Sequence, residues 1–406
     1  MRLFDWGDSQ QRGKSPQNQA RTRKQRRVVT LTILGVLAIG LLTGSVVVAM
    51  DLGSLRGKYG ELQDIVDEAT LRAAGRLIDE RRLLSEADAA QAADEAREIA
   101  RDYIARNTTL PQAISEGSND SSPSHHEATT TIEIGYLANT SRASGEMAPD
   151  NPAIFNAVRV RVTTKGESYG STTKFFANLL GIAGASSAVE ATAVIHSRIR
   201  GFESPGEDRA IPVLPFALDL HTWKRITSGK GADRWGWDRE RRIVRPGSDD
   251  FPEANLYPRE GGLADRRGTL DIGTRNRMHE IARQIRHGVS PNDLRGDRGV
   301  LMLDGNRELL LRGDQGISMG VQESLNSIRG EARVLPIFEA TQISADRVEY
   351  KIVKLVGVRV MNVQLAGAAA SKRVLVQPAA VVAEDAIRTS ETGTSEFVFA
   401  PPRLIQ

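Results

Sequence analysis

One uncharged apolar stretch lies near the start of the chain, at Val28–Met50. At ~1.5 Å per residue it makes about 34 Å of helix, enough to cross a hydrocarbon layer of about 30 Å. Arg26 and Arg27 directly precede it, and the positive-inside rule then keeps residues 1–27 in the cytoplasm. We expect one transmembrane helix in a bacterial inner membrane, with residues 51–406 extracytoplasmic. A cleaved signal peptide and a buried core helix are the alternatives.

The segment that follows, residues 51–107, has the apolar spacing of a helix. It contains no proline and is rich in Ala, Leu, Glu and Arg. Ser85 and Asp88 form a capping box, which predicts a second helix over Glu86–Arg106. The apolar stripe must cover either this protein's own sheet or a partner helix. We predict that this packing or partner face includes Leu62, Ile65, Ala69 and Ala73.

A polar loop at residues 112–127 separates these helices from segments with strand patterns. Thr129–Tyr136 and Ala157–Thr164 alternate or are β-branched, Lys174–Ile182 is a short helical pattern, and Ala188–Arg200 is another strand pattern. We therefore expect an α+β fold, with a long amphipathic helix packed on a small antiparallel sheet.

The second half of the chain is predicted to be mostly β, with long loops. Helices are expected at Arg275–His287 and Ser318–Ile328. Strands are expected at Val213–Leu220, Leu301–Leu303, Glu308–Leu311, Val334–Phe338, Arg347–Leu355, Gly357–Leu365 and Val374–Val376.

The composition shifts divide the chain into six segments. They are a basic cytoplasmic tail (1–27), the transmembrane helix (28–50), an α+β domain (51–201), a linker (202–211), a β-rich extracytoplasmic domain (212–385) and a C-terminal tail (386–406).

Charge and cysteine content narrow the chemistry. The whole chain carries +3, and residues 1–27 carry +6, so the remainder is at −3. A protein-wide nucleic-acid footprint is therefore not expected. The chain has no cysteine, which excludes disulfides, cysteine-based zinc sites and thiol nucleophiles.

Several segments resemble TadE/TadG-like Flp pilus-assembly proteins. The first is the apolar span running into Asp51 and Gly53, followed by an Asp- and Ala-rich helix with Leu62, Gln63, Asp67, Ala69, Leu71, Ala73 and Ala74. Further similar segments are Phe175–Ile182, Val189–Ala193, Val213–Asp219 and Lys372–Ala379. The resemblance implies a membrane-anchored accessory protein of a Tad/Flp-type pilus or a related secretion apparatus.

Candidate catalytic and metal-binding patterns are weak. Ser318 lies in a Gly-x-Ser-x-Gly motif, but the last histidine, His287, precedes it, whereas the hydrolase triad needs a later one. A helix N-cap is the simpler interpretation of Ser318. The pair His279 and His287, and the acidic group Asp249, Asp250 and Glu253, lack metal-site spacing. We expect neither an enzyme nor a bound cofactor or metal.

Three tryptophans, Trp223, Trp235 and Trp237, lie among arginines. They could form a platform for cell-wall glycan or another surface. The alternative is that they cover the core, with cations stacked on them.

Three functions follow, in order of preference. The first is a non-enzymatic component of pilus assembly or secretion, whose partners are membrane lipids and other assembly proteins. The second is a membrane-tethered module that binds glycan or a surface. The third is a tethered hydrolase.

Overall fold

The computed structural model describes residues 60–83, 85–108, 112–113, 128–164 and 187–405, except 205, 208, 259–263, 265, 274–276, 296–298 and 345–346. The predicted anchor Val28–Met50, with Arg26 and Arg27, and the helix expected at Lys174–Ile182 lie outside these residues. Within the described part, no helix is long and apolar enough to cross a membrane. Residues 63–164 and 188–406 belong to one compact unit, to which the following applies.

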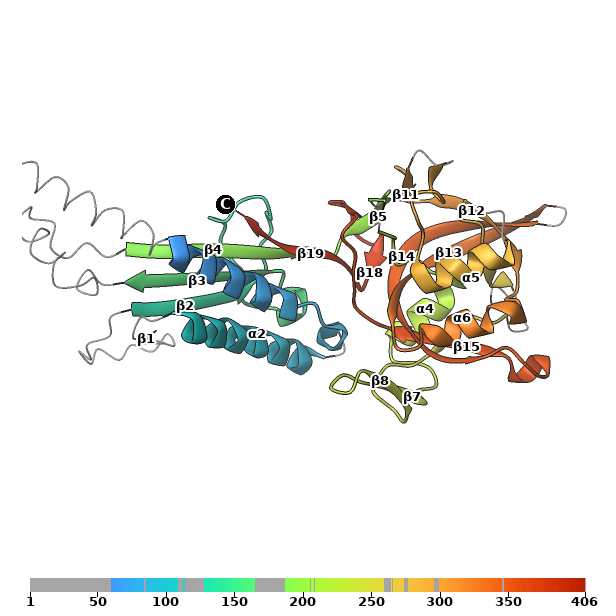
Figure 1. Ribbon diagram of the computed structural model, residues 1–406, viewed down its shortest axis with the longest axis horizontal. Helices are drawn as coiled ribbons and strands as arrows, with labels where there is room; N and C mark the ends of the chain where they lie inside the picture. Colours follow the sequence, from blue (N-terminus) through green and yellow to red (C-terminus); the bar gives the residue numbers. More distant parts are fainter. Residues whose placement is uncertain are drawn as a thin grey trace, which may run out of the picture. The chain divides into compact units, whose positions relative to one another are not determined.

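Two helices form one layer of the first half (Figure 1). The first runs over residues 60–76. The second, α2 (Glu86–Asn107), begins at Ser85, whose side chain accepts a hydrogen bond from the Asp88 amide at 3.1 Å, and the predicted helix start is confirmed. A short 3-10 helix (Glu80–Leu83) joins them.

The helices pack on a six-stranded sheet that draws strands from both ends of the chain. Its order is β1-β2-β3-β4-β19-β16. β2 and β3 pair antiparallel over their whole length. β19 pairs antiparallel with the last part of β4, from Thr192 to His196, and β16 runs parallel to β19. The strands are β1 (Gln112–Ala113), β2 (Ala128–Gly135), β3 (Ala157–Thr164), β4 (Ser187–His196), β16 (Val381–Val382) and β19 (Val398–Ile405).

The second half is built on an eight-stranded sheet, and its predicted β-rich character is confirmed. The strand order is β12-β10-β6-β13-β14-β15-β9, with β18 paired to β14. These strands are β6 (Phe216–Asp219), β9 (Ala254–Asn255), β10 (Gly268–Leu270), β12 (Leu309–Gln315), β13 (Ala332–Ser344), β14 (Arg347–Gln364), β15 (Arg373–Pro378) and β18 (Ser395–Glu396).

Each face of this sheet is covered by a different layer, because side chains alternate along a strand. On β6, Phe216 and Leu218 face one hydrophobic cluster and Ala217 faces the other. The first cluster lies under the helices α4 (Leu220–Thr227), α5 (Met278–His287) and α6 (Gln322–Ser327), which Figure 1 shows together. The second lies under a small sheet of β5 (Ile199–Glu203), β11 (Val300–Met302) and β17 (Ala386–Arg388).

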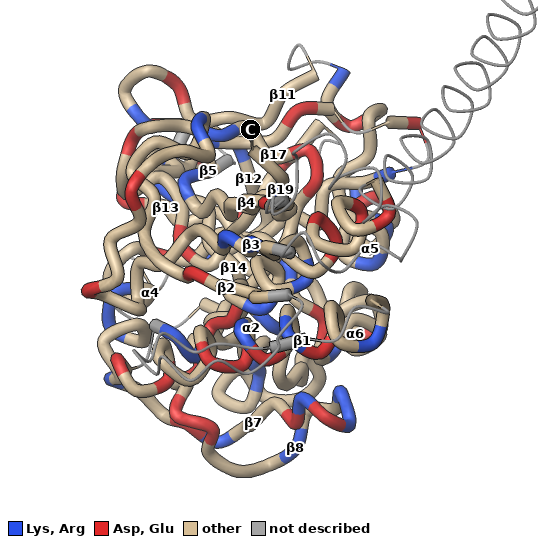
Figure 2. Tube along the Cα trace, turned by 90° about the vertical axis from the view of Figure 1, so that its left-hand side faces the viewer, with Lys and Arg blue, Asp and Glu red and all other residues tan. Residues whose placement is uncertain are grey.

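A two-stranded hairpin, β7 (Trp235–Asp238) and β8 (Ile243–Pro246), completes the second half. Figure 2 shows basic and acidic residues interspersed along the chain trace.

Several elements differ from those predicted. The expected strand at Ala188–Arg200 is divided between β4 and β5, because Ser395 interrupts it: its hydroxyl accepts from the Ile199 amide at 2.8 Å and donates to the Ser197 carbonyl at 2.7 Å. The two strands expected on either side of residue 356 are one strand, β14. Gly357 lies inside this strand. A Cβ at this position would come within 2.5 Å of the backbone oxygens of Ala379 and Phe397, so the close approach requires glycine.

Residues 386–406, which we predicted to be a tail, contain β17, β18 and β19. Residues 202–211, the predicted linker, begin with the end of β5. The proposed domain boundaries themselves stay predictions.

Candidate functional site: a charged junction around Asp79 and Glu80

The turn between the two helices of the first half buries two adjacent carboxylates. The side chain of Asp79 is 1% exposed and that of Glu80 is 9% exposed. Asp79 immediately precedes the 3-10 helix, and Glu80 opens it. A buried carboxylate is costly unless it is paired and hydrogen-bonded, so the partners of these two residues define the site.

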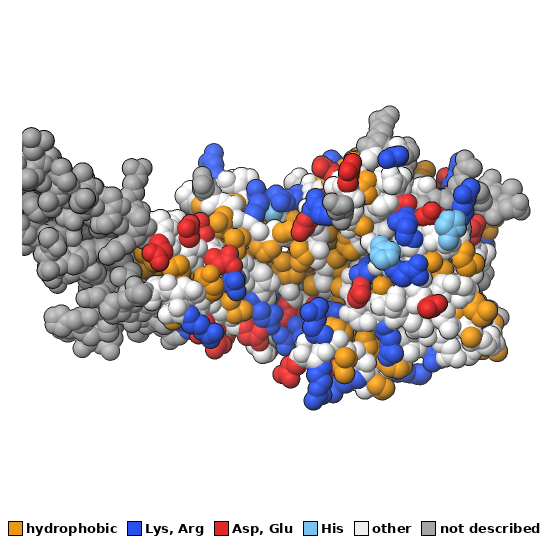
Figure 3. Space-filling model, viewed as in Figure 1, with side chains coloured by type: hydrophobic (Ala, Val, Ile, Leu, Met, Phe, Trp, Pro, Cys, Tyr) orange, Lys and Arg blue, Asp and Glu red, His pale blue; other side chains and the backbone are white. Residues whose placement is uncertain are grey.

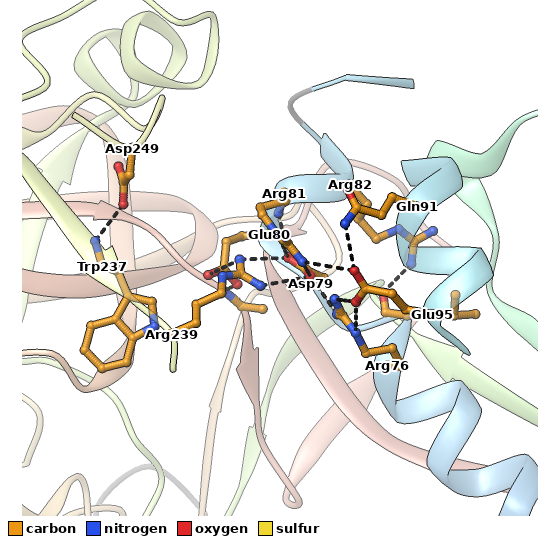
Figure 4. A network of polar contacts seen from close by, with 12 residues as sticks. Arg76, Asp79, Glu80, Arg81, Arg82, Gln91, Glu95, Trp237, Arg239 and Asp249 are labelled. Carbon is orange, nitrogen blue, oxygen red and sulfur yellow. Dashed lines mark hydrogen bonds and ion pairs between the residues drawn. The ribbon is translucent and has the colours of Figure 1, made fainter. Parts of the chain in front are cut away.

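Asp79 is surrounded by three arginines (Figure 4). Arg76 donates to Asp79 Oδ2 at 2.6 Å, and Arg81 Nη2 donates to the same oxygen at 3.0 Å. Arg239, from the loop after β7, donates through both Nη atoms, at 2.8 and 2.9 Å. This paired geometry is the strong form of an arginine–carboxylate contact.

These contacts control the ionisation of Asp79. Burial by itself would raise the pKa of the carboxyl. The hydrogen bonds from Arg239, Arg81 and Arg76 outweigh burial and hold the pKa of Asp79 well below its usual range. Asp79 is therefore a fixed negative charge at neutral pH.

Glu80 connects the same turn to the large sheet. Its Oε1 lies 2.9 Å from Arg239 Nη2 and 3.5 Å from Arg359 Nη2, and its Oε2 accepts from the Ala380 amide at 3.3 Å. Arg359 belongs to β14, and its guanidinium lies 4.1 Å from the ring centroid of Trp237. Residues far apart in the sequence thus meet at one turn.

Arg82 holds the turn to the loop before β3. Its guanidinium is buried and donates to the carbonyl oxygens of Leu77 (2.6 Å), Pro152 (3.3 Å), Ala153 (3.0 Å) and Phe155 (2.5 Å). Burial lowers the pKa of Arg82 to about 10, against a smaller opposing effect of Asp79. Arg82 stays protonated at neutral pH and acts as a crosslink between backbone segments.

The turn that carries Asp79 and Glu80 lies within a recognisable segment. Residues 72–193 match the family model for Tad-like Flp pilus-assembly. The resemblance seen in the sequence motifs is therefore confirmed over these residues, which we call the Tad-like segment. No curated protein and no solved structure matches the chain.

The Tad-like segment includes α2, β2, β3 and most of β4, together with Asp79, Glu80 and Arg82. Arg239 and Arg359 come from outside it. Asp79 and Glu80 are both engaged by arginines. The junction connects the Tad-like segment to the second half through these ion pairs.

The predicted packing face is mostly buried. Leu62, Ala69 and Ala73 are buried, but Ile65 is only half-buried. The neighbouring Val66 is fully buried, so Val66 takes the place of Ile65 on the buried face.

The three tryptophans are not a common platform. Trp223 is fully buried in α4, where its ring meets Phe397 edge-on and its Nε1 donates to Glu396 at 2.6 Å. Trp235 and Trp237 are each half-buried. The guanidinium of Arg329 lies 5.0 Å from the Trp235 ring centroid. The guanidinium of Arg359 lies over the ring of Trp237 in the same way. These contacts fit the alternative in which tryptophans cover the core under stacked cations.

The remaining candidates have structural roles. Ser318 is the N-cap of a 3-10 helix (Met319–Val321), and its hydroxyl accepts from the Gly320 amide at 3.3 Å. Asp249 accepts from the Trp237 amide at 2.8 Å, and Glu253 accepts from the Trp235 amide at 2.6 Å. Among the described residues, no group of three or more histidines or carboxylates could hold a metal ion.

Sequence reasoning did not select Asp79, Glu80 or Arg239. One signal was available: Asp79-Glu80-Arg81-Arg82 interrupts the apolar stripe between two helices. The distant partner Arg239 carries no such signal, because only the fold brings it to this turn.

Proposed function

We propose that this chain is a membrane-anchored, non-enzymatic accessory or structural component of a Tad/Flp-type pilus-assembly or related secretion system. The observation that carries the proposal is the match of residues 72–193 to the Tad-like family model. This stretch includes α2, β2 and β3 of the helix-on-sheet layer. Its partners are other pilus-assembly or secretion proteins.

A binding role without catalysis is supported by the state of the polar groups. The buried carboxylates Asp79 and Glu80 are saturated by arginines. Ser318 caps a helix end. The chain would work by holding partners against the membrane and presenting the second half to them.

The membrane proposal rests on the uncharged run Val28–Met50 and its flanking Arg26 and Arg27. The absence of native cysteine allows a direct test. In intact cells, a membrane-impermeant maleimide should label Met319→Cys, since Met319 is 60% exposed. Ser15→Cys should react only after lysis. Equal labelling of both variants in intact cells would contradict the proposed orientation.

The functional test is purification of the intact chain from cross-linked membranes of its native cell, followed by mass spectrometry. Recovery of pilins, a secretion ATPase or a platform membrane protein is the expected result. A chain shortened to residues 1–59 is the matched control, because it keeps the predicted anchor and lacks the Tad-like segment. Partners that copurify equally with this control, or recovery of cell-wall material alone, would refute assembly through the Tad-like segment.

A further inference from the structure

A groove of about 710 Å³ lies where β4 ends and β19 begins. Its size is within the range of cavities that hold ligands, ~300–1,000 Å³. In Figure 3, hydrophobic side chains gather in a hollow beside β19, with basic and histidine side chains along its upper edge. The apolar lining consists of Tyr136, Ile154, Phe155, Ile195, Phe397 and Phe399.

The charged groups of the groove are almost all basic. Arg198, Arg388 and Arg403 line it together with His196. None of these three arginines forms an ion pair with a carboxylate among the described residues. Arg403 instead donates to His196 Nε2 and to the Thr140 carbonyl, both at 3.3 Å.

The acidic residue of the lining is already engaged. Glu396 accepts from Trp223 Nε1 at 2.6 Å and forms an ion pair with Lys354. The fourth lining arginine, Arg82, donates to backbone carbonyls rather than to a carboxylate. The groove therefore carries an uncompensated positive charge.

The fold holds Arg388 and Arg403 close to one another and to His196, which is uncharged at neutral pH. Burial, and then the nearby Arg388 and Arg403, lower the pKa of His196 to about 4. Burial and Arg403 also lower the pKa of Arg388. An anionic group in the groove would relieve the repulsion between the two arginines, and a guanidinium pairs strongly with a carboxylate through charge-assisted hydrogen bonds.

Two apolar features make the groove more than a basic surface. Ile154 is 51% exposed at its edge. Phe397 has a φ of +60°, a conformation that is costly for a bulky side chain and that recurs at functional sites. The close approach of Gly357 to the Phe397 backbone fits this conformation.

We propose that this groove binds an extended acidic segment of a partner protein, in which carboxylates alternate with large apolar side chains. The carboxylates would pair with Arg198, Arg388 and Arg403, and the apolar side chains would pack on the exposed Ile154 and the half-buried Tyr136. Thr140, Ser141, Ser197 and Ser390 border the groove, and their hydroxyls suit a peptide backbone. The inference deepens the proposed assembly function by giving the partner its chemistry.

The probe is a fluorescein-labelled heptapeptide that alternates phenylalanine with aspartate between terminal glycines. Its binding to the full chain in detergent is followed by fluorescence anisotropy. Replacing each aspartate by asparagine, or each phenylalanine by serine, should abolish saturable binding. The double variant Arg198→Gln/Arg388→Gln should bind at least about tenfold more weakly, the loss expected when charge-assisted hydrogen bonds are removed. Ile154→Ser should weaken binding about fivefold, through lost apolar contact.

Arg312→Gln is the matched control, because Arg312 is an exposed arginine on β12, away from the groove. Its affinity should equal that of the unmodified chain, and all variants should share one unfolding curve. Binding that weakens equally in Arg312→Gln would reduce the effect to overall charge and overturn the proposal. Failure of the peptide, with Arg388-dependent binding of dioctanoyl phosphatidylglycerol instead, would assign the groove to a lipid headgroup. Recovery of assembly partners through the Tad-like segment does not depend on this groove. Failure of the groove proposal can therefore be distinguished from failure of the proposed assembly function.

Discussion

The two halves of the protein bury their cores with different side chains. In α2 the buried residues are Ala89, Ala92, Ala93, Ala96, Ala100 and Ile104. In the second half, large side chains such as Trp223, Phe216, Phe338 and Tyr350 are fully buried. α2 therefore packs on its neighbours through small side chains, whereas the second half fills space with branched and aromatic groups.

This difference has an energetic consequence. A buried alanine removes little apolar area from water, and hydrophobic stabilisation scales with that area. The helices of the first half thus depend on close approach and on the polar contacts at their ends. The Asp79 junction supplies such contacts, and it couples the alanine-packed layer to the more strongly packed second half.

The largest expected effect comes from placing a charge in the alanine-packed layer. Val66→Asp buries an unpaired carboxylate and should destabilise folding by roughly 5 kcal/mol. The neighbouring Ile65→Asp is the matched control, because Ile65 is half-buried and its carboxylate can reach water; we expect about 1 kcal/mol. Thermal unfolding of the full chain in detergent, with hydrogen exchange over residues 60–107, measures both. Equal losses in the two variants would mean that the two faces of this helix do not differ in burial.

The prediction of that helix shows what periodicity can establish. Three-to-four spacing predicted helix within residues 51–107, where the structure has a helix at 60–76, but it did not fix which apolar residues face the core. Spacing alone does not choose between Ile65 and Val66, which are adjacent in sequence. The choice depends on how the helix rolls on its sheet, and residues from the far end of the chain complete that sheet as β19.

The junction gives the second prediction. Asp79→Asn removes the charge that three arginines share and should cost about 3 kcal/mol at pH 7. The control, Asp94→Asn on α2, breaks an exposed pair with Arg97 and should cost less than about 1 kcal/mol. Denaturant unfolding measures both. A loss for Asp79→Asn no larger than for the control would show that the junction does not couple the two halves.

The stability difference between the unmodified chain and Asp79→Asn has a predictable pH dependence. The pKa of Asp79 is lower in the folded protein than in the unfolded chain, for which ~3.9 is typical. Its stabilising contribution is therefore complete above that value and is lost as the pH falls through the folded-state pKa. The stability gap between the unmodified chain and Asp79→Asn should be constant from about pH 7 to 5 and shrink below about pH 4. A gap that widens on acidification would contradict the assigned ionisation.

The candidate site was harder to predict than the fold. Helix starts such as Ser85 and strands such as Ala157–Thr164 follow from local chemistry, and both were found. The junction and the groove depend on Arg239, Arg359 and Arg388, which reach the first half only through long-range strand order. In the sequence these residues are three among many arginines, with no spacing that links them to Asp79 or His196.

The smallest expected effect tests the close packing itself. Ala96 is fully buried on α2, so Ala96→Leu must push the helix from the sheet and should cost about 2 kcal/mol. Ala105→Leu, at an exposed position of the same helix, should change stability by less than about 0.5 kcal/mol. In the second half, where large side chains fill the core, the damaging change is the reverse one: Phe338→Ala leaves a cavity. Denaturant unfolding measures both α2 variants. If Ala96→Leu lowered the free energy of unfolding no more than Ala105→Leu does, the first half would have room for larger side chains. The contrast between the two cores would then be one of composition and not of packing.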